Sequence, residues 1–339
     1  WHRHSFLYSM RIRCFLVRIL AIVLCTGAGF GSIAAAAEPR IAVSKSPLSL
    51  PFFVAKEKNL FAKYKVEPVV VECLGGDRCM KELVEGRVDL ATSTELPFMF
   101  AVFDGAPISL ITTFVTNKDD MRFIVRKSVL QQGGVKSLAG KRVGYVNRAS
   151  SHYYRDLFLL YQGIDPQAII PVPMGGEALA KALANGEVDA ISVWEPWGRV
   201  ALKLGGEDVV EVDTPRLYSQ SFNLTVRNEY RLSQARRASA VLAALNEAIQ
   251  FIKKNPGEAK RILVRDAGVS PDVVDMMWPT YRFELSLQQS LLTTLQGQAR
   301  WAQREGHVNK ALGEPEFLNF IDASLLRKLS AKAVDYVYP

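Results

Sequence analysis

The sequence predicts an α/β protein built from two similar lobes that face each other across a cleft. The first observation is an internal repeat, in which residues 75–95 match residues 175–195 at an offset of 100 positions. Both copies contain a Gly-Gly pair, the pattern Leu-x-x-Gly-x-Val-Asp and a final Glu. An offset of this size indicates two domain-sized copies, since solenoid repeats are much shorter. A cleft between two such lobes is a typical place for a small ligand.

The second observation is the alternation of short apolar or β-branched runs with helical segments. This alternation is typical of parallel sheets that are covered by helices on both faces. We expect eight strands, which are Ile41–Val43, Val66–Val71, Val88–Thr92, Ile108–Val115, Phe123–Val125, Lys141–Val146, Ile169–Val172 and Val188–Val193. The chain then changes to amphipathic helices, which we expect at Ala235–Lys254, Pro256–Arg265, Pro271–Met277 and Ser286–Arg304.

This helical tail is long enough to pack back on the first lobe, so the chain is expected to cross between the lobes twice. We place the crossings near Phe123–Lys127 and near Phe222–Val226. Lobe I then consists of residues 38–125 and 222–339, and lobe II of residues 126–221. Two crossing segments form a hinge, and closure of the lobes around a ligand is the expected motion.

The composition is that of an ordinary soluble protein, with 49% hydrophobic and 22% charged residues in a chain of 339. The formal net charge is +8, but half of it comes from four arginines in residues 1–37. The remaining charges are scattered and form no run of Lys and Arg. This excess mildly favours anionic partners and does not indicate binding to nucleic acid.

The amino-terminal segment has the pattern of a secretory signal peptide. A basic stretch precedes an apolar run that ends in Ala34–Ala37, where Ala35 and Ala37 match a small-x-small cleavage pattern. We therefore expect cleavage near Ala37 and export to the periplasm. An uncleaved membrane anchor is the alternative, because Ile19–Ala37 is just long enough to span a bilayer. A lipoprotein signal at Cys25 fits less well.

Only two cysteines, Cys73 and Cys79, remain after removal of this segment. They flank Gly75-Gly76 and are candidates for a small disulfide loop in an oxidising compartment. Two unpaired buried thiols are the alternative. No Cys or His partner accompanies them at the spacing of zinc ligands, so we expect no metal site.

Several helices are expected to begin beyond the carboxyl ends of strands, where open α/β sheets bind ligands. These helix starts are Ser46-Pro47, Gly75-Gly76-Asp77, Ser150-Ser151 and Gly175-Gly176-Glu177. The Ser150-Ser151 pair, followed by His152, is the best candidate anion site, because two hydroxyls join the free N–H groups of a helix terminus. Plain capping of the helix explains one of the two serines equally well.

The loops that follow the repeat strands supply the other candidates. Thr94-Glu95 and Trp194-Glu195 stand at equivalent positions on opposite sides of the expected cleft. A Glu at the cleft favours an ammonium, hydroxyl or amide donor, and Trp194 offers an apolar or cation–π face. In the alternative interpretation both Glu residues cap the helices that follow and Trp194 belongs to the core.

No catalytic motif occurs in the chain, and we expect a binding protein without cofactor or metal. Asp89 and Asp189 are expected to bond the local backbone at the Gly-x-Val-Asp turns. His307 lies near an expected helix end and should be exposed.

The residues that carry these features resemble a known family, the periplasmic solute-binding proteins of the nitrate, sulfonate, taurine and thiamine-precursor type that serve ABC importers. The resemblance rests on the two Leu-x-x-Gly-x-Val-Asp segments, Ser137-Leu138-x-Gly140-Lys141, Ser150-Ser151-His152-Tyr153, Trp194-Glu195-Pro196 and Asn255-Pro256. It implies a type II "Venus flytrap" fold, a monomer, cleft closure and delivery of the ligand to a membrane permease. The Cys73–Cys79 pair is not part of the family pattern.

The resemblance also implies ligand contacts at Ser46, Pro47, Leu48, Thr94, Glu95, Ser150, Ser151, His152, Trp194 and Glu195, to which the helix start at Gly175 is added. Our leading hypothesis is a small anionic or zwitterionic ligand such as a sulfonate or taurine. The alternatives are a thiamine-pyrimidine precursor or an aromatic carboxylate, and an exported enzyme or sensor domain on the same scaffold.

Overall fold

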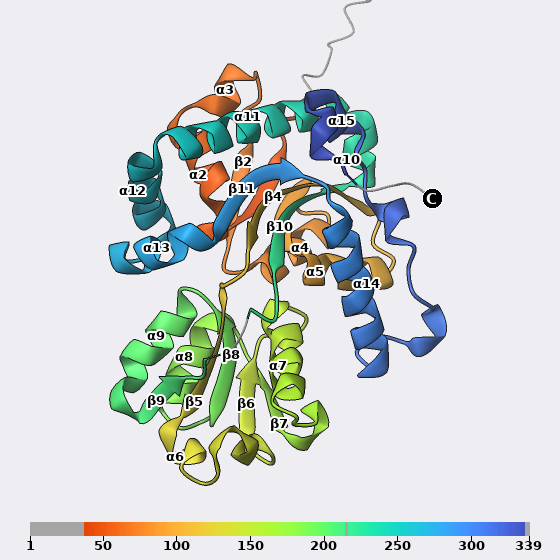
Figure 1. Ribbon diagram of the computed structural model, residues 1–339. Helices are drawn as coiled ribbons and strands as arrows, with labels where there is room; N and C mark the ends of the chain where they lie inside the picture. The colour runs from red at the N-terminus through yellow and green to blue at the C-terminus, as the bar shows by residue number, and fades with distance from the viewer. Residues whose placement is uncertain (1–36, 214–215, 336–339) are drawn as a thin grey trace, which may run out of the picture. The chain divides into compact units, whose positions relative to one another are not determined.

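The computed structural model describes residues 37–213 and 216–335. The expected signal segment therefore lies outside the described residues, apart from Ala37. The described chain from Glu38 onward contains two mixed β-sheets, each covered by helices (Figure 1). Within these ranges, no helix has the length and apolar character needed to cross a bilayer.

The first sheet has six strands in the order β11-β4-β10-β3-β1-β2. Strands β2, β1 and β3 run parallel, and β10, β4 and β11 are joined to them by antiparallel pairing. The strands of this sheet are β1 (Arg40–Ser44), β2 (Val69–Cys73), β3 (Leu90–Thr94), β4 (Ile108–Asn117), β10 (Gln220–Arg227) and β11 (Tyr281–Ser286).

The second sheet has five strands in the order β7-β6-β8-β5-β9. Strands β7, β6 and β8 are parallel, and β5 is antiparallel to both β8 and β9. The strands of this sheet are β5 (Met121–Arg126), β6 (Arg142–Tyr145), β7 (Ile170–Pro173), β8 (Ala190–Trp194) and β9 (Val209–Glu211).

The sequence repeat is a structural repeat. Helix α4 (Gly76–Val84) and strand β3 lie at an offset of 100 positions from helix α8 (Gly176–Ala184) and strand β8. Asp89 accepts a hydrogen bond from the backbone N–H of Arg40, and Asp189 accepts one from that of Arg142, at 2.9 Å in both cases. The expectation of local backbone bonds was wrong, because each Asp ties its turn to the first residue of the neighbouring strand.

The sheets are mixed rather than purely parallel because each receives a strand that arrives from the other sheet. Strand β5 follows β4 and begins opposite the end of β8, with Met121 paired to Trp194. Strand β10 follows β9 and places Phe222 opposite Thr94 at the end of β3. A strand that starts where its neighbour ends must run in the opposite direction. The chain thus changes sheets between β4 and β5 and between β9 and β10, before the segments where the sequence placed the crossings.

Both faces of the second sheet are buried, as the pattern of β5 illustrates. Phe123 and Val125 join a cluster with Phe158 of helix α7 (Ser150–Tyr161), whereas Ile124 joins a cluster with Leu179 of α8. Alternate residues of a strand point to opposite faces of the sheet, so the side chains of one short apolar strand pack into two hydrophobic clusters. Helix α7 covers one face of this sheet, and α8 and α9 (Trp197–Gly205) cover the other (Figure 1).

The carboxyl-terminal helices pack with the first sheet, as expected from their amphipathic pattern. Helix α11 (Ala235–Lys254) lies over α2 (Leu50–Glu57), and α14 (Gln289–Arg304) packs on α5 (Glu95–Phe103) near the opposite face of the sheet (Figure 1). The strand β11 at the edge of the sheet was not predicted, since its six residues lie between two helical segments. The remaining elements of this region are α3 (Leu60–Lys63), α10 (Asn228–Ser233), α12 (Pro256–Ala267), α13 (Pro271–Met277) and α15 (Ser324–Leu329).

Candidate functional site

A pocket lies where the ends of strands from both sheets meet the first residues of helices α4 and α7. It encloses about 360 Å³, part of which is open to solvent. This size suits a ligand of a few heavy atoms, near the lower end of the range for small-molecule sites. The lining residues are Ser44, Ser46, Leu48, Gly75, Gly76, Asp77, Thr94, Pro97, Asp120, Ala149, Ser150, Trp194, Gln220 and Phe222.

The two sheets meet directly at this pocket. The hydroxyl of Ser150, on α7, donates a hydrogen bond to the hydroxyl of Thr94, at the end of β3, with 2.8 Å between the oxygens. Arg78 of α4 also forms an ion pair of 2.7 Å with Glu177 of α8. These contacts join elements of different sheets, so the site has the geometry of a closed cleft.

Four buried polar atoms of the lining residues have no hydrogen-bond partner among the described residues. They are the hydroxyls of Ser44 and Ser46, Oδ1 of Asp120 and Oε1 of Gln220. A buried polar group without a partner costs about 1–3 kcal/mol, so four around one space are expected to be satisfied by a bound molecule or water. The two serine hydroxyls can donate hydrogen bonds, and the Asp120 and Gln220 oxygens accept them. A ligand that satisfies all four atoms therefore needs both hydrogen-bond acceptors and hydrogen-bond donors.

The charged residues that line the pocket are acidic. Asp77 and Asp120 are the two, and neither Lys nor Arg is among the lining residues. Burial, followed by the nearby charge of Glu195, raises the pKa of Asp120 to about 7. Burial also raises the pKa of Asp77. In their ionised forms these carboxylates would repel a simple anion and attract a cationic group.

Two glycines allow the start of α4 to approach the end of β3. A Cβ on Gly76 would lie 2.9 Å from the Cα of Ser93, and Gly75 has a φ of 118°, which favours glycine. Cys73 and Cys79 form a disulfide that brackets this turn. The covalent link therefore fixes the segment that presents Gly75, Gly76 and Asp77 to the pocket.

The carboxylate of Glu95, a predicted ligand contact, is engaged within the protein. It is fully buried and accepts hydrogen bonds from the hydroxyl of Tyr218 and from the N–H and hydroxyl of Ser221. Burial raises the pKa of this carboxyl group, although the bonds from Tyr218 and Ser221 oppose the shift. Glu95 is not among the lining residues and holds the second crossing segment against α5.

Glu195 is likewise engaged within the protein. Its carboxylate pairs with Arg122 at 2.9 Å, and both side chains are buried. The same carboxylate accepts the backbone N–H of Arg199 at 3.0 Å, which caps the first turn of α9. This is the capping alternative of the sequence analysis. Trp194, by contrast, lines the pocket and is only partly buried.

Four further candidates do not line the pocket. Ser151 does not cap α7 but lies in its first turn, and its hydroxyl accepts the N–H of Val146 at 2.8 Å. Pro47 is buried in the first turn after β1, and Gly175 packs against Arg78. His152 is buried beside Tyr145. The pocket therefore gathers Ser46, Leu48, Thr94, Ser150 and Trp194 of the predicted set.

The most polar part of the pocket was not predicted from the sequence. Asp120 lies in the first crossing segment, and Gln220 begins β10 after the second. Gln220 donates to Oδ2 of Asp120 at 2.6 Å, so the two crossing segments are joined at the pocket. The available signal was the polar run of residues 117–120 between two apolar strands, which was treated only as a connection.

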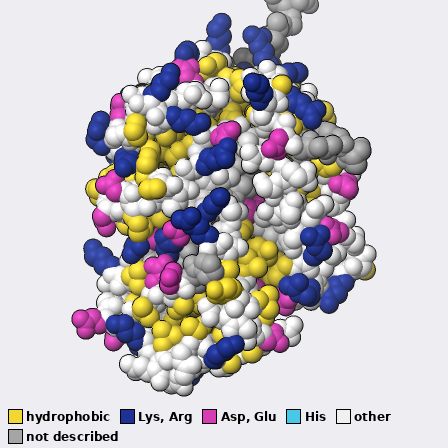
Figure 2. Space-filling view, in the orientation of Figure 1, with side chains coloured by type: hydrophobic (Ala, Val, Ile, Leu, Met, Phe, Trp, Pro, Cys, Tyr) yellow, Lys and Arg dark blue, Asp and Glu magenta, His cyan; other side chains and the backbone are white. Residues whose placement is uncertain are grey.

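The face of the molecule drawn in Figure 2 has Lys and Arg side chains interspersed with Asp and Glu, without a continuous basic stripe. This surface agrees with the scattered charges of the sequence.

Residues 46–259 match the model of the family described as NMT1/THI5 like. The chain belongs to this family. The match begins at the first pocket serine after β1 and extends into α12, so it includes both sheets and both crossings.

Three comparisons place this NMT1/THI5-like protein among known relatives. It is 25% identical over 67% of its length to a provisional aliphatic sulfonates-binding protein of Escherichia coli (strain K12), of which 71% is covered. It is 23% identical over 80% of its length to a provisional thiamine biosynthesis protein of Haemophilus influenzae (strain ATCC 51907 / DSM 11121 / KW20 / Rd), covering 88% of that protein.

Among solved structures, the alkanesulfonate-binding protein SsuA from Xanthomonas axonopodis pv. citri, bound to MOPS, has a TM-score of 0.69. The identity is 19%, and the alignment covers 85% of this chain and 99% of that one. At this identity the likeness establishes the fold, which is that of the two-lobed periplasmic binding proteins. The expected fold class is thus confirmed.

Proposed function

We propose that this protein is the exported binding component of an ABC importer and that it captures a small zwitterion with an acid group at one end and an ammonium at the other, such as taurine. Membership of the NMT1/THI5-like family and the two-lobed fold support the general role. The observation that carries the choice of ligand is the set of four unpartnered polar atoms around the pocket.

The acceptors of the pocket form its cation-binding end. Oδ1 of Asp120 and Oε1 of Gln220 are both buried and lack a hydrogen-bond partner among the described residues. A donor group of the ligand would supply that partner. An ammonium has three N–H donors and suits this pair, and a bond between an ammonium and a carboxylate is among the stronger hydrogen bonds in proteins. A ligand with an acid group alone would leave both acceptors without a donor.

The donors of the pocket form its acid-binding end. The hydroxyls of Ser44 and Ser46 would each donate to an oxygen of a sulfonate or carboxylate. The first residues of α4 and α7 also line the pocket, and the first N–H groups of a helix lack partners within the helix. Trp194 and Phe222 would cover the short apolar link between the two ends of the ligand.

Closure of the cleft would require the two crossing segments to bend. We propose that residues 118–120 and 216–219 contribute to this hinge, because they lie where the chain passes between the two sheets. Asp120 belongs to the first segment and is bonded to Gln220, directly after the second. A ligand held by this pair would therefore couple its own binding to the positions of the two sheets.

A thiamine-pyrimidine precursor is the second candidate. Trp194 and Phe222 give the pocket two aromatic side chains, and a relative carries a name linked to thiamine biosynthesis. The amino group of such a ring would donate to Asp120, and the ring would stack on Trp194. This ligand differs from the zwitterion because it needs no acid group at Ser44 and Ser46.

Export and delivery complete the proposal. The signal pattern of residues 1–37 supports cleavage and passage to the periplasm, where the Cys73–Cys79 bond is stable. The closed, ligand-bound form would then dock on a membrane permease.

A thermal-shift screen of protein freed of its ligand tests the choice of cargo. The panel contains taurine, ethanesulfonate, nitrate, an aminopyrimidine and benzoate. A ligand at 100 times its dissociation constant raises the free energy of unfolding by about 2.7 kcal/mol. We expect the largest shift with taurine. A larger shift with ethanesulfonate or nitrate would overturn the zwitterion, and a larger shift with the aminopyrimidine would select the second candidate.

A further inference from the structure

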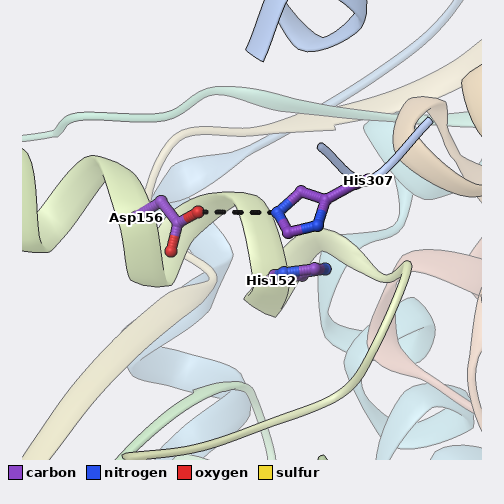
Figure 3. Close-up of side chains that lie close together, drawn as sticks. All are labelled: His152, Asp156 and His307. Atoms are coloured by element: carbon purple, nitrogen blue, oxygen red, sulfur yellow. Dashed lines mark ion pairs between the residues drawn. The ribbon is translucent and has the colours of Figure 1, made fainter. Parts of the chain in front are cut away.

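A second cluster of ligand-type side chains lies away from the pocket. His152, Asp156 and His307 each offer one ligand atom, and these atoms all lie within 4.8 Å of one another. Figure 3 shows the two residues of α7 with the imidazole of His307 beside them. His307 was expected to be exposed, but 25% of its side chain is accessible and the ring packs between Trp301 and His152.

The three residues come from elements of different sheets. His152 and Asp156 are four positions apart on α7, so they share one face of a helix that covers the second sheet. His307 follows α14, whose residue Trp301 belongs to the core cluster of the first sheet. The cluster therefore exists only when these two elements lie together.

The orientation of the ligand atoms is set by their neighbours. Nδ1 of His152 lies 3.4 Å from the backbone N of Arg148, a long hydrogen bond, and a bound metal would compete with this weak contact for the imidazole lone pair. Trp301 donates to Oδ2 of Asp156 at 2.9 Å, and Arg155 binds the other oxygen. Hydrogen bonds of this kind to a ligating carboxylate are typical of metal sites.

One atom of the cluster lacks a partner. Nε2 of His307 is buried and forms no hydrogen bond with any described residue, and it lies 4.0 Å from Oδ2 of Asp156. Two histidines and a carboxylate are a common ligand set for zinc, with metal–ligand distances of about 2.0–2.2 Å. The ligand atoms of a tetrahedral site lie about 3.3 Å apart, so small side-chain rotations would bring these three into range.

We propose that His152, Asp156 and His307 bind a divalent transition metal of the Zn²⁺ class and that this metal fastens α7 to the segment after α14. The site is separate from the cargo pocket and independent of the identity of the cargo. It assigns to His152 a role different from the ligand contact that the family resemblance implied. Three protein ligands leave a fourth position for water.

The charges around the cluster limit which ion fits. Arg155 is the nearest cation, and its guanidinium pairs with Oδ1 of Asp156 and lies over the ring of Tyr145. Asp156 therefore offers one oxygen rather than two. A hard cation such as Mg²⁺ prefers several oxygens, whereas two imidazoles and one oxygen suit Zn²⁺.

Calorimetric titration tests the site. The sample is the purified protein, from which bound metal has been removed with a chelator. We expect saturable binding of one Zn²⁺ per chain and no comparable binding of Mg²⁺. His307→Gln and Asp156→Asn should each weaken Zn²⁺ binding at least tenfold. Glu314→Gln is the matched control, because Glu314 is on the same carboxyl-terminal segment and pairs with Arg300 instead. It should leave Zn²⁺ binding unchanged.

Two further readouts make the result decisive. Because Asp156 is buried and its variant can fail to fold, the half-buried His307 supplies the primary test.

Co²⁺ bound to the wild type should give a visible spectrum of an imidazole-ligated ion, and His307→Gln should lose it. In small-angle scattering, Zn²⁺ should lower the radius of gyration of the wild type and not of His307→Gln. Absent Zn²⁺ binding, or equal affinity in His307→Gln, would overturn the site, and an unchanged radius would overturn the fastening.

Discussion

Ser150 and Thr94 join the two sheets at the pocket through a single hydrogen bond between their hydroxyls, with 2.8 Å between the oxygens. Both residues line the pocket and both are buried. Thr94 ends the repeat strand β3, and Ser150 begins α7. The bond therefore stands at the point where the sheets would separate if the cleft opened.

Replacing Ser150 by Ala should weaken cargo binding by loss of this bond in the closed form. A typical hydrogen bond contributes about 1 kcal/mol, which corresponds to roughly a fivefold rise in the dissociation constant. Isothermal titration with taurine measures the change. Ser128→Ala, at an exposed position in the short helix after β5, is the control. Equal affinity in Ser150→Ala and the wild type would show that this bond does not stabilise the closed form.

The affinity for a zwitterion should rise with pH between about 5 and 8. Burial raises the pKa of Asp120 to about 7, so this group is largely protonated at pH 5 and ionised at pH 8. An ammonium needs the ionised form, and below the pKa the affinity should fall about tenfold per pH unit. A ligand that carried only an acid group would show the opposite slope. Titrations at four pH values measure this slope, and Asp120→Asn should flatten it.

The same group predicts the pH dependence of the free protein. Its pKa in the folded state is above the ordinary value of 3.8, so the folded state holds a proton that the unfolded state has lost. The contribution of Asp120 to stability is therefore fully present below about pH 4 and is lost as the pH rises through about 7. Asp120→Asn should be less sensitive to pH than the wild type over this window when both are unfolded by urea.

The fold was predictable from the sequence where the pattern was local. The Gly-Gly pairs and the Gly-x-Val-Asp turns located α4, β3, α8 and β8, because each needs a particular residue at a particular place. Strand β5 was recognised as an apolar segment and β10 only as a crossing between the lobes, because the direction of both strands depends on where the chain arrives from. Such information is not contained in the periodicity of a strand.

The pocket was predictable only in part for the same reason. Ser150, Thr94 and Trp194 stand at helix starts or strand ends, which sequence patterns mark. Asp120 and Gln220 are 100 positions apart and meet only because both crossing segments pass the pocket. The role of Glu195 depended on Arg122, a distant residue on the antiparallel strand. Long-range pairs of this kind carry no local signature.

Trp194 should contribute to cargo binding through contact with the apolar part of the ligand. Trp194→Ala should weaken binding by roughly tenfold or more, since loss of an aromatic contact costs about 1.5–3 kcal/mol, and Trp194→Phe should retain most of the affinity. Trp278→Ala is a control at an aromatic residue that does not line this pocket. If both Trp194 variants bound as the wild type does, the ligand would have to lie elsewhere.

The Cys73–Cys79 bond should stabilise the protein and hold the pocket turn in place. The loop that it closes is short, so the entropic contribution is about 2 kcal/mol. The double variant Cys73→Ser and Cys79→Ser should therefore have a lower Tm, and its affinity for taurine should fall because Gly75–Asp77 is less constrained. A chemically reduced wild type is the matched comparison. An unchanged Tm in both samples would contradict the stabilising role.

The comparison of taurine with ethanesulfonate tests whether Asp120 receives the ammonium of a zwitterion. The two molecules share the sulfonate and the two-carbon link and differ in the amine. Isothermal titration at pH 8 should give at least tenfold tighter binding of taurine to the wild type. Asp120→Asn should lose this preference, whereas Asp119→Asn, at the half-exposed neighbouring position, should keep it. Tighter binding of ethanesulfonate, or a preference for taurine that survives in Asp120→Asn, would show that Asp120 does not receive the ammonium.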